Sequence, residues 1–144
     1  MSNTQPPARM KATARRDGNT LRHTVQVRDH NIAVDEPHVS GGEDTGPSPQ
    51  ELLAVSLASC TAITIEMYAE RKGWEIGRVE VEVEYTPAER GCPTKFELVM
   101  RLADDVPEEQ VERLRVIAAK CPVHRVLDGE VMFQERVERV DMAA

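Results

Sequence analysis

Two cysteines stand at positions where a thiol either does chemistry or fills a core. Cys60 lies in the run LLAVSLASCTAITI, residues 52–65, which carries no charge. Cys121 opens the segment Cys-Pro-Val-His, directly after a stretch with helical apolar periodicity. One thiol inside a buried helix and a second at a helix junction predict a two-cysteine redox site. Core packing is the alternative for both, because free cysteine is among the most buried residue types.

A reactive cysteine needs a lowered thiol pKa, and burial in apolar surroundings has the opposite effect. The uncharged run supplies no cation to Cys60, so an arginine of the N-terminal strands has to provide one. Cys121 precedes Pro122, and its sulfur is therefore expected to cap a short helix at the positive end of the helix dipole. Cys92, in a Gly-Cys-Pro turn, is interpreted as an incidental exposed thiol.

Composition excludes several functional classes. The chain has 144 residues, 18 basic and 25 acidic, with a formal net charge of −7 and 3% aromatic residues. A chain this acidic lacks the basic surface and the stacking rings that nucleic-acid binding needs. The longest uncharged run ends at Glu66, short of the roughly 18 residues of a membrane span. The length predicts one domain over residues 1–144.

The cysteine usage and the N-terminal segment predict a cytoplasmic protein that holds no metal and no cofactor. The first residues lack the apolar core of a secretion signal. Three cysteines form no disulfide framework, which suits a reducing compartment. Cys121 and His124 have the spacing of half a zinc site, but the sequence offers no second such pair and no glycine-rich phosphate loop.

Hydrophobic periodicity predicts an α+β fold. Residues 1–18 are polar and are expected to form a loose N-terminal arm. Apolar residues alternate over residues 21–34 and predict a hairpin with its turn at 29–31. Arg22 and Arg28 would then share one face of its first strand. Further strands are predicted at 78–85, 95–102 and 131–140, and helices at 48–72, 107–120 and 123–129.

The long central helix has clear start and stop signals. Ser48 is a good N-cap, Pro49 suits the first helical position, and Glu51 completes a capping box with Ser48. Gly73 ends the helix after two basic residues. A helix that is apolar on all sides for about four turns cannot lie on the surface of a monomer, so the sequence predicts an obligate homodimer.

Three motifs resemble the OsmC/Ohr family, the osmotically inducible and organic hydroperoxide resistance proteins, in its broader OsmC-like branch. They are Gly-Pro-Ser-Pro-Gln-Glu-Leu-Leu at 46–53 running into Ala-Ser-Cys at 58–60, Tyr-Ala-x-Arg-Lys-Gly-Trp at 68–74, and Cys-Pro-Val-His-Arg at 121–125. The resemblance implies an intertwined homodimer in which antiparallel sheets wrap around two long central helices.

The resemblance also implies an activity, the thiol-dependent reduction of organic hydroperoxides in oxidative-stress defence. Cys60 would attack the hydroperoxide as a thiolate and become a sulfenic acid, and Cys121 would resolve that acid to a disulfide. A dithiol reductant, often a lipoyl group in the family, would reopen the disulfide. The family's arginine, which stabilises the thiolate, comes from the N-terminal strands, where Arg22 and Arg28 are the two candidates.

Two positions depart from the family pattern and keep a second function open. The hydroperoxide resistance proteins carry a glutamate ten residues before the first cysteine, where it orients the arginine; this chain has Gln50 there and Glu51 one position later. Nine residues along a helix place Glu51 opposite Cys60, so its capping role is an equal alternative. Thr61 stands where the peroxidases usually have phenylalanine. The alternative function is a non-catalytic OsmC-like dimer that binds a small apolar or reactive ligand at the interface pocket.

Overall fold

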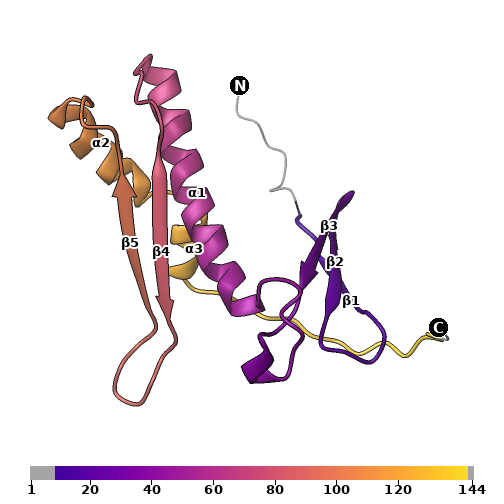
Figure 1. Cartoon of the computed structure of the whole chain (residues 1–144). Helices are drawn as coiled ribbons and strands as arrows, with labels where there is room; N and C mark the ends of the chain where they lie inside the picture. The colour runs from indigo at the N-terminus through magenta and orange to yellow at the C-terminus, as the bar shows by residue number, and fades with distance from the viewer. Residues whose placement is uncertain (1–8, 143–144) are drawn as a thin grey trace. The chain divides into compact units, whose positions relative to one another are not determined.

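The computed structural model describes residues 9–142, and its elements are those of a mixed α+β fold (Figure 1). In chain order they are β1 (Thr13–Arg16), β2 (His23–Val27), β3 (His30–Val34), the 3₁₀ helix η1 (His38–Ser40), α1 (Pro49–Lys72), β4 (Glu80–Thr86), β5 (Lys95–Arg101), α2 (Glu108–Ala118) and α3 (Pro122–Leu127). The predicted fold class, α+β with antiparallel sheets, is confirmed.

Residue contacts divide the chain into two compact units. Unit 1 comprises Met1–Ser56 and Val83–Leu98, and unit 2 comprises Leu57–Glu82 and Val99–Ala144. α1, β4 and β5 each contribute residues to both units. The expected single domain over residues 1–144 stays a prediction.

Unit 1 contains a three-stranded antiparallel sheet in the order β1-β2-β3. The hairpin between β2 and β3 is tighter than predicted, because Val27 pairs with His30 and leaves a turn of only two residues, Arg28 and Asp29. Arg28 has a positive φ of 54°, the backbone conformation that a two-residue hairpin turn requires at its first position. The turn therefore lies one residue earlier than the 29–31 expected from the sequence.

One face of this sheet borders an apolar hollow of about 550 Å³. Alternation predicts that Leu21, His23, Val25 and Val27 share one face of the first strand, and all of them except Val27 line this hollow. The other lining residues are Ala14, Ile32, Val34, Asp35, Glu36, Pro49 and Leu52. Period-two alternation therefore predicts the apolar face of β2 for Leu21, His23 and Val25.

β1 corrects the expectation of a loose arm over residues 1–18. Residues Thr13–Arg16 pair with β2 in antiparallel register, so that Thr13 lies opposite Gln26 and Arg16 opposite His23. The strand has the sequence TARR, in which no apolar alternation signals a strand. Exposed arginines are typical of an edge strand, because charge discourages further strand pairing. Residues 1–8 of the expected arm lie outside the described residues.

A buried carboxylate organises the loop between β3 and α1. Asp35 is 2% exposed and accepts hydrogen bonds from the backbone N–H of Glu36 at 2.8 Å and from the hydroxyl of Thr45 at 2.6 Å. The backbone N–H groups of Glu43 and Thr45 donate to the same carboxylate at 3.3 and 3.2 Å. The Thr45 hydroxyl above all, helped by these N–H groups and opposed by burial, lowers the pKa of Asp35 from 3.8 to about 2.

We expect Asp35→Asn to lower the melting temperature at neutral pH by several degrees, because an amide cannot accept all four hydrogen bonds. The folded pKa of about 2 lies below the ordinary 3.8, so the carboxylate stabilises the fold above about pH 4, and this contribution disappears as the pH falls towards about 2. Thermal melts of both proteins across this range should therefore converge at the acid end. Asp44→Asn, an exposed change in the same loop, is the control. A melting-temperature gap that stays constant down to about pH 2 would contradict the role.

The capping and the length of α1 follow the sequence prediction. Glu51 donates its backbone N–H to Ser48 Oγ at 3.1 Å, and the Glu51 carboxylate accepts the Ser48 N–H at 3.0 Å, which is the predicted capping box. Gly73, with a φ of 71°, follows the last helical residue. By length and composition α1 could also cross a membrane, which corrects the expectation that no segment is long enough. One such helix is weak evidence, since the core helix of a soluble protein has the same composition.

Unit 2 contains a compact apolar core. Ile65 and Leu114 are fully buried, and they join α1 to α2. The buried cluster consists of Ile65, Ala69, Ile76, Val106, Leu114, Ile117 and Ala118, with Tyr68, Trp74, Val79, Met100, Leu102 and Val111 packed around it. Because α2 ends at Ala118, this core also holds the segment that leads into Cys121.

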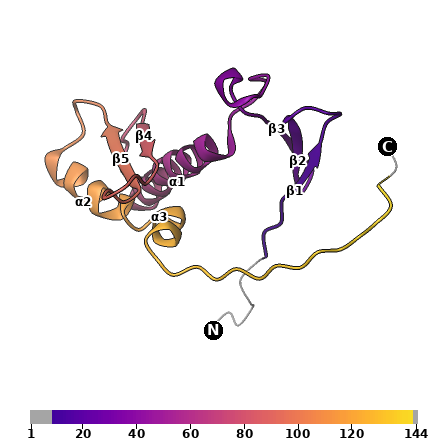
Figure 2. The same cartoon turned by 90° about the horizontal axis from the view of Figure 1, so that it is seen from below.

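The prediction of a strand at residues 131–140 is wrong for the single chain. Residues 130–142 form an extended segment without a helix or strand (Figure 2), and Phe133 and Val137 are 83% and 93% exposed. A strand needs a neighbouring strand for its backbone N–H and C=O groups, and within residues 9–142 this segment has none.

Candidate functional site

Cys121 is fully buried and caps α3, as predicted. Its Sγ accepts a hydrogen bond from the backbone N–H of His124 at 3.3 Å. Pro122 occupies the first turn of α3, where its missing N–H leaves no hydrogen bond unmade. The sulfur therefore lies at the N-terminal end of α3, where the backbone dipoles favour negative charge.

Thr61 connects the two cysteine-bearing segments of unit 2. Its hydroxyl oxygen lies 3.7 Å from Cys121 Sγ, and both side chains are 0% exposed. Cys60 immediately precedes Thr61 on α1 and is half-buried. The fold of unit 2 thus places the two predicted redox cysteines near each other, although their segments are 60 residues apart in the chain.

All three cysteines are free thiols. Cys92 is exposed in the connection between β4 and β5, where it forms an isolated bridge with Glu89. Cys92 belongs to unit 1, whereas Cys60 and Cys121 belong to unit 2. In the described part of the chain, no three histidine, cysteine or acidic side chains gather as metal ligands.

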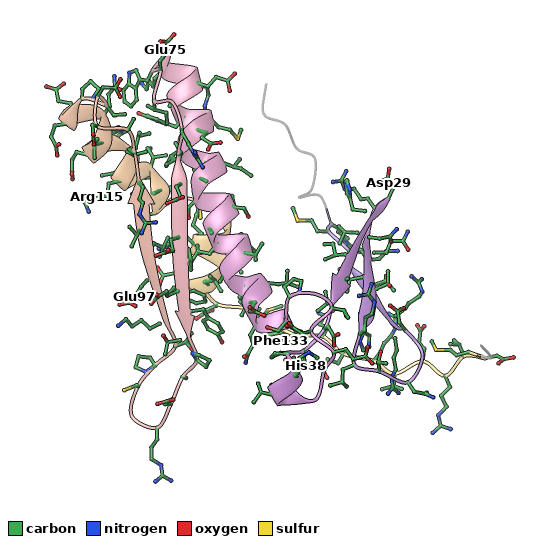
Figure 3. The ribbon with its side chains drawn as sticks, in the orientation of Figure 1. Asp29, His38, Glu75, Glu97, Arg115 and Phe133 are labelled. Carbon is green, nitrogen blue, oxygen red and sulfur yellow. The ribbon has the colours of Figure 1, made fainter. Side chains whose placement is uncertain are left out.

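The two candidate arginines lie in unit 1, at opposite ends of β2. Arg22 forms an ion pair with Asp17 at 3.2 Å and donates to the carbonyl oxygen of Thr45 at 3.3 Å. Arg28 is in the hairpin turn, next to Asp29 at the tip (Figure 3). The expectation that both arginines share a strand face is therefore wrong, because the chain leaves the strand at Arg28. That either arginine serves Cys60 stays a prediction.

Glu51 serves as the capping-box residue of α1. Its hydrogen bonds with Ser48, above all the one from the backbone N–H, lower the pKa of Glu51, so its carboxylate is ionised at neutral pH. Gln50, which has the place of the family's glutamate, lines a hollow of about 470 Å³ together with Glu51 and Tyr85. The action of Glu51 on an arginine stays a prediction.

The sequence interpretation missed the role of Thr61 as the partner of Cys121. The signal was present, since Thr61 is the one hydroxyl in the buried stripe of α1, which consists of Leu57, Thr61, Ile65 and Ala69. Buried hydroxyl groups are nearly always hydrogen-bonded, so a polar residue on this face indicates a buried polar neighbour. The sequence does not say which segment supplies that neighbour.

Comparison with known proteins shows what the chain is similar to. The family model described as OsmC-like protein matches residues 41–136. A solved OsmC-like protein from Mycoplasma pneumoniae has a TM-score of 0.71 and 18% identity, over 86% of this chain and 90% of that chain. The organic hydroperoxide resistance protein OhrB of Bacillus subtilis has a TM-score of 0.59 and 23% identity, over 85% of this chain and 92% of that chain. No curated protein matches the chain in sequence.

Proposed function

The chain belongs to the OsmC family, and on this basis we propose that it is a thiol-dependent peroxidase that reduces organic hydroperoxides through Cys60 and Cys121. One observation carries the proposal: Cys121, buried at the N-terminus of α3, contacts Thr61, the residue that follows Cys60. The similarity in fold to a protein named for organic hydroperoxide resistance supports the substrate class.

The proposed reaction has three balanced steps. The Cys60 thiolate attacks the terminal hydroxyl oxygen of the peroxide, the O–O bond breaks, and the alkoxide leaves and takes up a proton to become an alcohol; Cys60 keeps the hydroxyl group as a sulfenic acid. Cys121 Sγ then attacks the sulfenic sulfur, an S–S bond forms, and the hydroxyl group leaves as water with the thiol proton. A dithiol reductant, such as a lipoyl group, reduces the disulfide and is itself oxidised to a cyclic disulfide.

The proposed enzyme is a homodimer that works in the reducing cytoplasm. Ile63 and Met67, one turn apart on α1, are 54% and 55% exposed in the single chain, and apolar surfaces of this kind mark interfaces. The extended C-terminal segment with its exposed apolar side chains points to the same need for a partner. A reducing compartment would return Cys60 and Cys121 to thiols after each oxidation and keep Cys92 reduced.

The alternative function is a non-catalytic dimer that binds a small apolar ligand. The apolar hollow of unit 1, about 550 Å³ and lined by residues such as Leu21, Val25 and Ile32, favours it, because small-molecule sites have volumes of about 300–1,000 Å³. Gln50, at the position of the family's glutamate, also favours it.

The proposal predicts that one equivalent of cumene hydroperoxide converts the reduced protein to a Cys60–Cys121 disulfide. The products are identified by acid quenching, alkylation of the remaining thiols and peptide mass mapping. Cys60→Ser should block this disulfide, and Cys92→Ser, an exposed change in unit 1, should not. If both thiols stay free, or if Cys92 alone is oxidised, the peroxidase proposal fails and the ligand-binding function takes its place.

A further inference from the structure

The buried stripe of α1 contains one hydroxyl among apolar side chains. Leu57, Thr61, Ile65 and Ala69 follow one another at every fourth position, and all four are buried. A hydroxyl buried without a partner costs free energy, so Thr61 has to find one. Its partner is Cys121 Sγ, and no buried side-chain nitrogen or oxygen in the described residues is left without a hydrogen bond.

The sulfur of Cys121 has two hydrogen-bonding neighbours while it is reduced. The backbone N–H of His124 donates to Sγ at 3.3 Å, and the Thr61 hydroxyl lies 3.7 Å from the same atom. A hydroxyl both donates and accepts, so it accepts from a thiol and donates to a thiolate. Thr61 therefore satisfies the reduced Cys121 in either protonation state, which an isosteric valine cannot do.

From this geometry we infer that Thr61 is a positioning residue that shifts the Cys60–Cys121 couple towards its dithiol state, an inference that rests on the proposed function. In the disulfide, Cys121 Sγ is bonded to Cys60 Sγ, has no proton to donate and is a weaker acceptor than a thiolate. Both cysteines are free thiols in the structure, so Cys121 Sγ also has to approach Cys60 Sγ before an S–S bond can form. An interaction made in only one of two states shifts the equilibrium towards that state.

The shift of the Cys60–Cys121 couple towards the dithiol affects the last step of the proposed cycle, the reduction of the disulfide. The protein disulfide and a dithiol exchange to give the protein dithiol and a cyclic disulfide, through a mixed disulfide in which one protein sulfur is released first. Released Cys121 regains its hydrogen bonds with Thr61 and His124, and these compete with a renewed attack of Cys121 Sγ on the sulfur of Cys60. Thr61 thus favours complete reduction of both cysteines over re-formation of the Cys60–Cys121 disulfide.

The test is a redox titration of the full-length protein with Cys92 replaced by serine, so that only one couple exchanges. Three proteins are compared: the one that keeps Thr61, the Thr61→Val variant and the Thr61→Ser variant. Each is equilibrated with mixtures of reduced and oxidised dithiothreitol and quenched in acid, and the fraction of protein with the Cys60–Cys121 disulfide is measured by mass spectrometry. We expect Thr61→Val to raise the equilibrium constant for disulfide formation about fivefold, the loss of one hydrogen bond. Thr61→Ser keeps the hydroxyl and should stay within about twofold.

Two further variants serve as a control and as a substitute for Thr61→Val. Thr64→Val removes a half-buried hydroxyl from the same helix and should leave the constant unchanged. If Thr61→Val does not fold, Thr61→Ala removes the hydroxyl together with the methyl group of threonine, and the same redox titration is made with it. A purely structural Thr61 would lower the thermal stability of both redox forms and leave the equilibrium between them unaltered.

The outcomes separate this inference from the function on which it rests. Equal constants for protein with Thr61 and for Thr61→Val overturn the inference, while a disulfide that forms in both leaves the peroxidase proposal standing. If no Cys60–Cys121 disulfide forms with Thr61 in place, the proposed function itself fails and the inference falls with it.

Discussion

Cys60→Ser is expected to lower peroxide turnover by at least about 1,000-fold, because a serine hydroxyl is a much weaker nucleophile towards the O–O bond than a thiolate. No sulfenic acid can form at this position, so the variant should not consume even one equivalent of peroxide. The measurement is the consumption of cumene hydroperoxide with dithiothreitol as the reductant, followed for all three cysteine-to-serine variants under the same conditions.

Cys121→Ser should behave differently, because the first chemical step does not need the resolving cysteine. Without a reductant, we expect it to consume one equivalent rapidly and to accumulate a Cys60 sulfenic acid that dimedone traps; with dithiothreitol present, it should turn over more slowly than the wild type. Cys92→Ser is the matched control and should keep full activity, since Cys92 is exposed and takes no part in the proposed reaction. Turnover retained in Cys60→Ser, or lost in Cys92→Ser, would move the reactive thiol to another residue.

Ile63→Glu is expected to weaken the proposed homodimer by at least about 100-fold in Kd, because a carboxylate placed in an apolar interface is desolvated without a partner. Ile63 is 54% exposed in the single chain, so the substitution leaves the core of unit 2 untouched. Sedimentation velocity over a range of concentrations measures the shift from dimer to monomer, and circular dichroism shows whether the variant keeps its helices.

The control for this experiment is Val116→Glu, the same kind of change on the exposed side of α2, where Val116 is 40% exposed. It should leave the dimer unchanged. The α1 face is excluded as the interface if Ile63→Glu sediments as a dimer at the same concentrations as the wild type. A wild-type protein that sediments as a monomer would overturn the proposed assembly altogether.

Secondary structure was predictable where the deciding contacts are local. The capping box of α1 joins Ser48 to Glu51, three residues apart, and Cys121 caps α3 through the N–H of His124, also three residues away. In both places the atoms that stabilise the element lie within one helical turn. Pattern and residue type were therefore sufficient.

Strands were predicted less well, because a strand depends on a partner elsewhere in the chain. β1 exists through its register with β2 and has no apolar pattern of its own, whereas residues 131–140 have strand-like composition and no neighbour to pair with. Turn-forming residues predict the hairpin turn at 29–31, whereas the pairing of Val27 with His30 leaves Arg28 and Asp29 as the turn.

The sequence by itself determined the family motifs, the two cysteines and the caps of α1 and α3, because each depends on residue types at short spacing. Only the tertiary structure decided that Thr61 is the buried partner of Cys121, since that contact joins α1 to the residue before α3 across 60 positions. The same holds for Asp35, whose carboxylate gathers N–H groups from a loop that folds back on it. Contacts of this kind depend on packing and loop closure, which no local pattern encodes.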